Sequence, residues 1–231
     1  EGLNDSLLKG EEGFLSGNKD AVGEWIGQGE LAPAQDGAEL IITLDHSIQF
    51  RVEKELAYLN ETWQPKGGSI LVIEPKTGAI RAMASLPNFD PNNYRKEKNI
   101  RVFLNPVVSS QFEPGSVAKV LTMAAALDDN KITPETTYED KGIRYIDNYE
   151  IQNFDEKTYG EQTMSEALEK SLNLGAIFAV EQMTKAKFYN YLLDFGLGER
   201  SGIVLPGENK GDISNLGQKY VRDIHYATAA F

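Results

Sequence analysis

The 231 residues can form one large domain, or one domain with part of a second, and 41% of them are hydrophobic. The formal net charge of −12 disfavours nucleic-acid and membrane-surface binding through bulk charge. The absence of cysteine excludes disulfides, thiolate catalysis and Cys-ligated zinc. The two histidines, His46 and His225, lie far apart, so no metal site and no cofactor are expected.

The first 38 residues are rich in glycine and acidic residues without a sustained period. They are typical of an irregular segment: a linker, or the tail of a preceding non-catalytic module. A β-branched run at 39–44 follows, and Asp45 is a plausible N-cap for a helix that extends through Leu59. We therefore expect a boundary that separates residues 1–38 from a main domain at 39–231.

Residues 68–74 (GSILVIE) and 79–85 (AIRAMAS) predict two antiparallel strands around the turn PKTG at 75–78. Residues 86–111 contain several Asn and Pro residues and predict a loop with short helical turns.

Proline and glycine at 114–115 break the chain just before Ser116, and the run VAKVLTMAAALDD predicts a buried helix. Residues 135–162 have β and loop character. Further helices are expected at about 165–169, 176–184 and 187–195, the last closed by glycines at 196 and 198. Helices clustered after a hairpin, without βαβ alternation, predict an α+β fold in which an antiparallel sheet carries a helical lobe.

Ser116 and Lys119 are spaced for nucleophilic catalysis, because residues three apart share one helix face. A serine hydroxyl needs a base within hydrogen-bond reach, and a lysine can serve if burial depresses its pKa. The apolar run from Val120 to Ala124 is expected to desolvate the lysine. A Ser-x-x-Lys string on its own is a weak signal.

Ser171 and Asn173 form a second polar pair, 55 residues after Ser116. Between two helices, the hydroxyl and the amide can point into one cleft, where the serine relays a proton and the asparagine orients the lysine or a substrate amide. A Ser-x-Asn string on its own is more typical of a helix cap or a turn.

The order of the two motifs is that of the penicillin-recognising serine acyl transferases, and the sequence around them resembles the class B penicillin-binding proteins. The strings that carry the resemblance are LDHSIQ at 44–49, EPKTGAIRAMAS at 74–85, FEPGS at 112–116, FGLG at 195–198 and LPGE at 205–208. It covers residues from about 40 to the end. It implies a penicillin-binding, serine β-lactamase-like transpeptidase fold.

The resemblance implies a peptidoglycan D,D-transpeptidase that crosslinks stem peptides through an acyl-enzyme on Ser116 and is inhibited by β-lactams. Lys119 is then the base, and Ser171 and Asn173 position groups and shuttle protons. The expected partners are stem peptides, β-lactams, a membrane glycan polymerase and elongation or division proteins. The expected location is the outer face of the bacterial cytoplasmic membrane, with an anchor outside this chain.

The KTG string at 76–78 matches the third motif of this family in letters, but it precedes Ser116 and is assigned to the hairpin turn. We expect the functional third motif beyond Phe231, so the fold is expected to be incomplete at its C-terminus and these residues alone to be inactive. The alternatives are a serine β-lactamase, which needs a deacylating carboxylate or modified lysine, and a non-catalytic scaffold module of a cell-wall synthesis complex.

Overall fold

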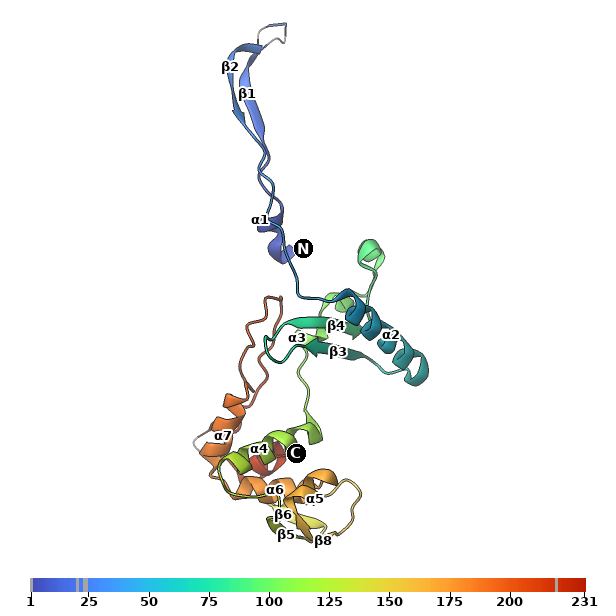
Figure 1. The fold of residues 1–231 in the computed structure, drawn as a ribbon, viewed down its shortest axis with the longest axis vertical. Helices are drawn as coiled ribbons and strands as arrows, with labels where there is room; N and C mark the ends of the chain where they lie inside the picture. The colour runs from blue at the N-terminus through green and yellow to red at the C-terminus, as the bar shows by residue number, and fades with distance from the viewer. Residues whose placement is uncertain (1, 20, 23–24, 219) are drawn as a thin grey trace. The chain divides into compact units, whose positions relative to one another are not determined.

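The computed structural model describes residues 2–19, 21–22, 25–218 and 220–231. The chain divides into two compact units. One comprises Glu1–Ser109 with Val204–Gly207, and the other comprises Ser110–Ile203 with Glu208–Phe231. Both combine helices with pairs of antiparallel strands (Figure 1), in agreement with the predicted α+β class.

The first unit begins with a hairpin that the sequence analysis did not predict. Strands β1 (Phe14–Lys19) and β2 (Trp25–Ala32) pair antiparallel, after the short helices η1 (Gly2–Asn4) and α1 (Asp5–Leu8). The expectation of irregular structure is therefore wrong here. Both strands contain glycine, which is depleted in strands and weakens the pattern that identifies them. The domain boundary at residue 38 stays a prediction.

Helix α2 (His46–Trp63) packs against a hairpin of β3 (Gly68–Ile73) and β4 (Ile80–Leu86), and Figure 1 shows it lying across these strands. The strands are antiparallel, as predicted. The Asp45 carboxylate accepts hydrogen bonds from the N–H groups of Ser47 and Ile48, at 2.9 and 3.0 Å. This confirms Asp45 as the N-cap.

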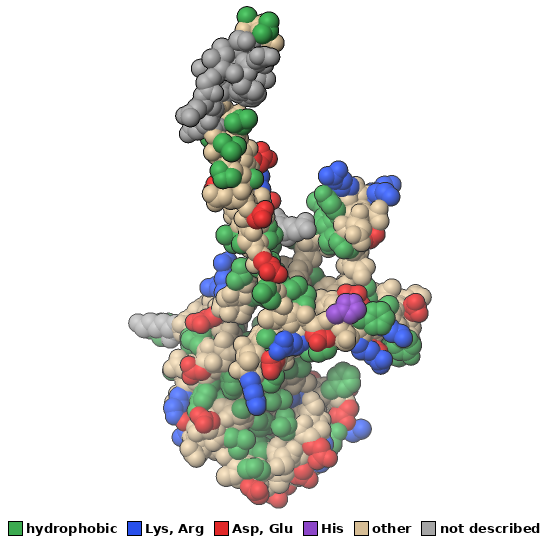
Figure 2. Space-filling view, turned by 45° about the horizontal axis from the view of Figure 1, so that its top comes forward, with side chains coloured by type: hydrophobic (Ala, Val, Ile, Leu, Met, Phe, Trp, Pro, Cys, Tyr) green, Lys and Arg blue, Asp and Glu red, His purple; other side chains and the backbone are tan. Residues whose placement is uncertain are grey.

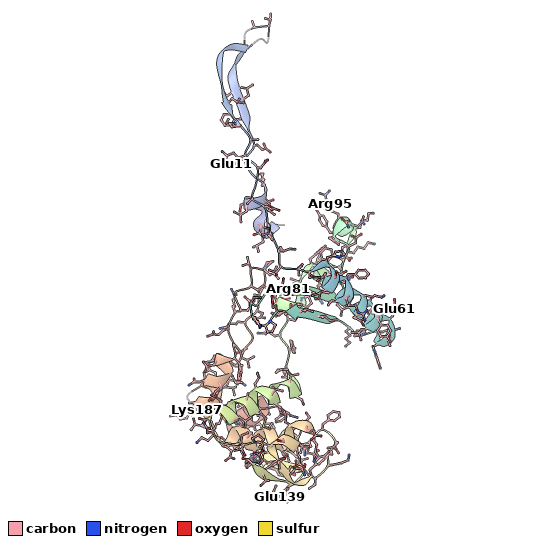
Figure 3. All side chains as sticks on the ribbon, viewed as in Figure 1. Glu11, Glu61, Arg81, Arg95, Glu139 and Lys187 are labelled. Carbon is pink, nitrogen blue, oxygen red and sulfur yellow. The ribbon has the colours of Figure 1, made fainter. Side chains whose placement is uncertain are left out.

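The turn between β3 and β4 contains the KTG string. Gly78 has a φ of +72°, a conformation that favours glycine, and its N–H donates to the carbonyl of Glu74 at 2.9 Å. Arg81 on β4 reaches back to the Glu74 carboxylate at 2.6 Å; Figure 3 labels this arginine. The string is thus part of a tight turn, as predicted. The rest of the unit consists of η2 (Pro91–Lys96), η3 (Ile100–Phe103) and α3 (Pro106–Ser109).

The second unit holds the four predicted site residues. The helix predicted after Ser116 is present, preceded by a short 3-10 turn, and residues 137–163 form four short strands in two antiparallel pairs, β5 with β8 and β6 with β7. Its elements are η4 (Gly115–Val117), α4 (Ala118–Asp128), β5 (Thr137–Asp140), β6 (Ile143–Ile146), β7 (Tyr149–Gln152), β8 (Gly160–Thr163), α5 (Met164–Glu169), α6 (Asn173–Glu181), α7 (Lys185–Asp194) and α8 (Asp223–Ala229).

Helix α6 is the centre of the second unit. It contacts α4, α5 and α8 as well as strands β5 and β7 (Figure 1). The sequence NLGAIFAVE is apolar around most of its circumference, as expected for a helix enclosed on several sides. Gly175 permits this enclosure, because a Cβ there would lie 2.5 Å from the Ala167 Cβ on α5. The core of the unit forms around this helix.

The surface mixes charges of both signs. Figure 2 shows acidic, basic and apolar side chains interspersed on the face it displays. Glu139, labelled in Figure 3, is exposed on β5, whereas its neighbours Tyr138 and Asp140 are buried. Among the described residues, no helix combines the length and the apolar character needed to cross a bilayer.

Candidate active site

The amine of Lys119 joins the two sequence motifs. Its Nζ lies 3.2 Å from the Ser116 Oγ, 3.0 Å from the Ser171 Oγ and 2.6 Å from the Ser171 carbonyl oxygen. These three contacts match the three N–H donors of a lysine ammonium. Ser116 and Ser171, which are 55 residues apart in the sequence, therefore meet at one nitrogen.

Lys119 is almost completely buried, with 1% of the residue exposed. Burial disfavours the charged form and lowers the pKa of this ammonium to about 8, from an ordinary value of 10.5. A neutral amine keeps a lone pair that can accept the proton of the Ser116 hydroxyl 3.2 Å away. The geometry and the pKa both suit a general base.

The expected source of that burial is only partly correct. Val120 and Ala124 are exposed on α4, so these two residues of the apolar run do not desolvate the lysine. Thr122 and Met123 are buried on the inner side of the same helix, as Lys119 is. Helix α4 thus buries one face, and Lys119 lies on that face.

Ser116 is exposed and lies in the 3-10 turn η4, just before α4. Gly115, directly before it, has a φ of +58°, and a Cβ at that position would meet open space. The left-handed backbone, rather than crowding, therefore favours glycine there. The Pro114–Gly115 pair sets the entry into the helix and presents the Ser116 hydroxyl one turn from Lys119.

Ser171 ends helix α5 in a Schellman motif. The N–H of Ser171 donates to the Leu168 carbonyl at 3.1 Å, and the N–H of Leu172 donates to the Ala167 carbonyl at 2.8 Å. The φ of Ser171 is +55°, where helices most often place glycine. This conformation costs a non-glycine residue about 1–2 kcal/mol. It coincides with a geometry in which both Ser171 oxygens lie within hydrogen-bond distance of Lys119.

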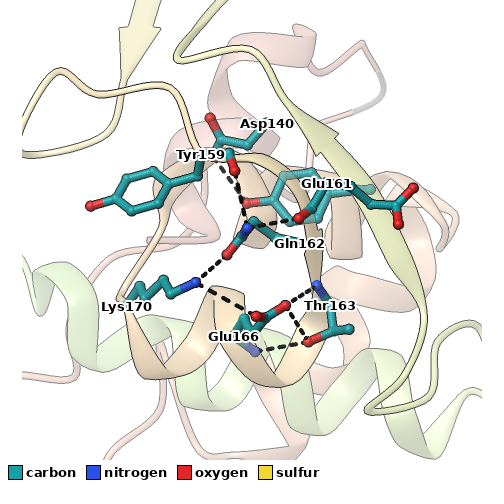
Figure 4. Close-up of polar contacts among 8 residues, drawn as sticks. Asp140, Tyr159, Glu161, Gln162, Thr163, Glu166 and Lys170 are labelled. Carbon is teal, nitrogen blue, oxygen red and sulfur yellow. Dashed lines mark hydrogen bonds and ion pairs between the residues drawn. The ribbon is translucent and has the colours of Figure 1, made fainter.

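Polar contacts secure helix α5 at both ends (Figure 4). At its start, Thr163 and Glu166 form a capping box, with the Glu166 carboxylate 2.9 Å from the Thr163 N–H. At its end, Lys170 donates to the Gln162 Oε1 and pairs with Glu166 at 3.7 Å. This network fixes the position of Lys170, the residue directly before Ser171.

Asn173 begins α6, and the sequence predicts that it orients the lysine or a substrate amide. Its Nδ2 donates to the Gln152 carbonyl at 2.7 Å. The Lys119 amine is held by Ser171. The structure therefore brings Ser116, Lys119 and Ser171 together and anchors Asn173 to the end of strand β7.

Sequence reasoning missed the residues that support the start of α6. Asn153 accepts a hydrogen bond from the Leu174 N–H at 3.3 Å, and buried Asp140 accepts one from the Asn153 Nδ2 at 2.9 Å. Only the Asp140–Gly142 spacing carried a signal, because an aspartate two residues before a glycine is typical of an Asx turn. No local pattern links residues 140 and 153 to residue 174.

Most of the chain matches a known family model. Residues 68–230 match the model described as "Penicillin binding protein transpeptidase domain". Among curated relatives, "Stage V sporulation protein D" of Bacillus subtilis is 33% identical over all of this chain and 36% of its own length. "Peptidoglycan D,D-transpeptidase FtsI" of Escherichia coli is 28% identical over 98% of this chain and 38% of its own.

Solved structures show the same likeness. The structure of "TP domain from Burkholderia pseudomallei penicillin-binding protein 3" superposes with a TM-score of 0.69 and 26% identity, over 82% of this chain and 52% of that one. A "peptidoglycan glycosyltransferase from Burkholderia ambifaria" gives a TM-score of 0.71 and 26% identity, over 83% of this chain and 55% of that one.

The chain spans about a third of the length of these curated relatives. The matched model covers most of it, including both motifs. The family and fold predicted from the motifs are therefore confirmed, and the chain belongs to the penicillin-binding protein transpeptidase domain family.

Proposed function

We propose that this chain carries the residues with which a peptidoglycan D,D-transpeptidase forms its acyl-enzyme, with Ser116 as nucleophile and Lys119 as base. The observation that supports this most strongly is the buried Lys119 amine, 3.2 Å from the Ser116 Oγ and 3.0 Å from the Ser171 Oγ. With a pKa of about 8, roughly a tenth of Lys119 is neutral at pH 7. A base whose pKa lies near the working pH is efficient both in accepting a proton and in giving it up again.

In the proposed reaction, neutral Lys119 accepts the Ser116 hydroxyl proton as the Oγ attacks the penultimate D-Ala carbonyl of a stem peptide. The tetrahedral intermediate collapses, the peptide C–N bond breaks, and the terminal D-Ala leaves with a proton passed from Lys119 through the Ser171 hydroxyl. The amine of a neighbouring stem then attacks the ester and gives its proton back along the same path. Ser116 is regenerated and one peptide bond replaces another.

β-Lactams react by the same first step in this proposal. Attack of the Ser116 Oγ breaks the lactam C–N bond, but the leaving amine stays tethered to the acyl group. The tethered amine keeps an acceptor from reaching the ester, so the ester persists.

Asn173 is proposed to orient the substrate amide, while its Nδ2 is held by the Gln152 carbonyl.

The proposed setting follows the relatives, whose names concern peptidoglycan D,D-transpeptidases and penicillin-binding proteins. Stem peptides are the proposed substrates. The proposed location is the outer face of the cytoplasmic membrane in the bacterial envelope, beside a glycan polymerase and elongation or division proteins.

Release of D-Ala from a stem pentapeptide, with and without an amine acceptor, tests this function in the full-length protein. We expect release in the wild type, a crosslinked product that needs the acceptor, and loss of both in Ser116→Ala. Ser110→Ala, at another exposed serine six residues earlier in the sequence, is the matched control and should retain activity. Rapid hydrolysis of penicillin without crosslinking would favour the β-lactamase alternative, and a folded protein inert to both substrates would favour a scaffold.

A further inference from the structure

Asp140 is the most deeply buried carboxylate of the second unit, with 0% of the residue exposed. A buried carboxylate is tolerated only where hydrogen bonds replace its lost hydration. Here the Gly142 N–H donates at 2.8 Å, the Asn153 Nδ2 at 2.9 Å and the Tyr138 hydroxyl at 3.1 Å. Burial, and then the neighbouring carboxylate, raise the pKa of Tyr138 well above its ordinary value, so the hydroxyl stays a donor.

The Asp140 carboxylate determines which way the Asn153 amide faces. Asn153 is 3% exposed, and its Nδ2 points to Asp140, which leaves the Oδ1 facing α6. That oxygen accepts the Leu174 N–H at 3.3 Å. Because side chains alternate along β5, Tyr138 and Asp140 both point inward. The strand therefore orients the Asn153 amide from the interior of the unit.

The bond from Asn153 replaces a cap that α6 lacks. The N-cap residue of this helix is Leu172, whose side chain forms no capping hydrogen bond. Leu174 is the second helical residue, whose N–H is one that a capping side chain normally satisfies. Asn153 provides that acceptor from 21 residues upstream, and the adjacent Gln152 carbonyl accepts from the Asn173 Nδ2 at 2.7 Å.

Gln152, the last residue of β7, and Asn153, which follows it, thus fix the first two residues of α6. Ser171 lies two residues before Asn173, the first residue of α6, and both of its oxygens hold the Lys119 amine. Any shift in the start of α6 is transmitted to these contacts through Leu172, which is buried. Misplacement of a catalytic group by about 1 Å can cost about a hundredfold in rate.

We infer that Asn153, oriented by the buried Asp140, is a positioning residue for acylation, because it caps the start of α6 and thereby fixes Ser171 against Lys119. The inference rests on the proposed function. The hydrogen bonds of Asn153 and Asp140 go to residues other than Ser116 and Lys119, so the effect should appear in the rate of acylation rather than in the binding of the β-lactam that precedes it.

The test measures acylation of full-length protein by a fluorescent penicillin over a range of concentrations, which separates binding from the acylation rate constant. Asn153→Ala should lower that rate constant about tenfold or more and leave the binding constant within about twofold. Asn153→Asp should also be slow, because two carboxylates would then face each other across the 2.9 Å contact.

The exchange variant Asp140→Asn with Asn153→Asp provides a rescue. The amide at 140 would donate to the carboxylate at 153 and to the Tyr138 oxygen, and its own oxygen would accept the Gly142 N–H. The carboxylate at 153 would still accept the Leu174 N–H. Two contacts change: the 3.4 Å contact from Asn153 to the Lys157 carbonyl is lost, and the Tyr138 hydroxyl accepts from position 140 instead of donating to it. We expect the acylation rate constant to return to within about threefold of the wild type.

Leu192→Ala is the control for a general loss of stability, because Leu192 is a buried residue of α7 outside the site. It should lower the melting temperature without slowing acylation at a temperature well below it. A rate constant for Asn153→Ala within threefold of the wild type, or an exchange variant that folds but stays as slow as Asn153→Asp, would overturn the inference. An unlabelled wild type would instead refute the proposed function itself.

Discussion

At the residue scale, Ser171 combines a strained backbone with two contacts to Lys119. Its φ of +55° closes α5, where glycine is normally preferred, and its two oxygens lie 2.6 and 3.0 Å from the Lys119 amine. Stability alone would favour glycine at this position. A hydroxyl that the proposed chemistry requires explains why serine stands there instead.

Replacement of Ser171 therefore separates stability from function. Ser171→Gly and Ser171→Ala both remove the hydroxyl, so both should lose penicillin acylation. The glycine variant relieves about 1–2 kcal/mol of left-handed strain, less about 0.4–1 kcal/mol for the greater freedom of its unfolded chain. We expect it to be about 0.5–1 kcal/mol more stable than the alanine variant in urea denaturation. An alanine variant more stable than the glycine variant would show that the residue is unstrained.

The pKa of Lys119 predicts the pH dependence of acylation. Since only the neutral amine can accept the Ser116 proton, the rate constant should rise from pH 6 to pH 9 with a midpoint near 8. A stopped-flow series with a saturating β-lactam measures it. A profile that is flat across this range, or one that falls, would rule out Lys119 as the base.

The same shift predicts a change in stability with pH. The folded pKa of Lys119, about 8, lies below the ordinary 10.5, so between these values the unfolded chain binds more protons than the folded one. The contribution of Lys119 to the free energy of unfolding should therefore increase as the pH rises from 8 to 10.5. Urea denaturation of the wild type and of Lys119→Met across this range measures the difference.

At the element scale, Gly175 tests how closely α6 approaches its neighbours. In an open helix, Gly→Ala stabilises by about 1 kcal/mol. Here the added Cβ would lie 2.5 Å from the Ala167 Cβ and 3.0 Å from the Tyr138 hydroxyl oxygen. We expect steric overlap to dominate, so Gly175→Ala should lower the free energy of unfolding by about 1–3 kcal/mol.

The compensating variant for this pair is Ala167→Gly combined with Gly175→Ala, which moves the methyl group from α5 to α6. It should recover part of the loss, since the contact with Tyr138 remains. Urea denaturation of the three variants measures the coupling between the two sites. If Gly175→Ala proved more stable than the wild type, the close approach of α5 and α6 would be wrong.

The elements that the sequence predicted are those that carry their own local signals. Asp45 marks the start of α2 because its carboxylate caps its own helix. The α6 helix was expected from residue 176 but starts at Asn173. Its start was missed because Gly175 favours a break in the helix and Leu172 gives no capping signal. The residue that caps the helix is Asn153, which follows strand β7 and lies 21 residues before Leu174.

At the scale of the whole molecule, the order of the motifs predicted which residues meet, but not how they meet. Ser116, Lys119 and Ser171 come together as expected. Periodicity could not reveal that the Ser171 carbonyl holds the lysine, because that contact depends on a left-handed residue at the end of α5. The Asn173 Nδ2 donates to the Gln152 carbonyl, a contact that no motif predicted, and its expected role in orienting the lysine or a substrate amide stays a prediction.

The central claim is that Ser116 is a nucleophile activated by Lys119. Intact-mass spectrometry of the full-length protein after incubation with a penicillin tests it most directly. We predict one adduct of one drug mass on the wild type, no adduct on Ser116→Ala, and an adduct that forms far more slowly on Lys119→Arg, whose guanidinium does not deprotonate. A folded wild type without an adduct, or an adduct that survives in Ser116→Ala, would contradict it.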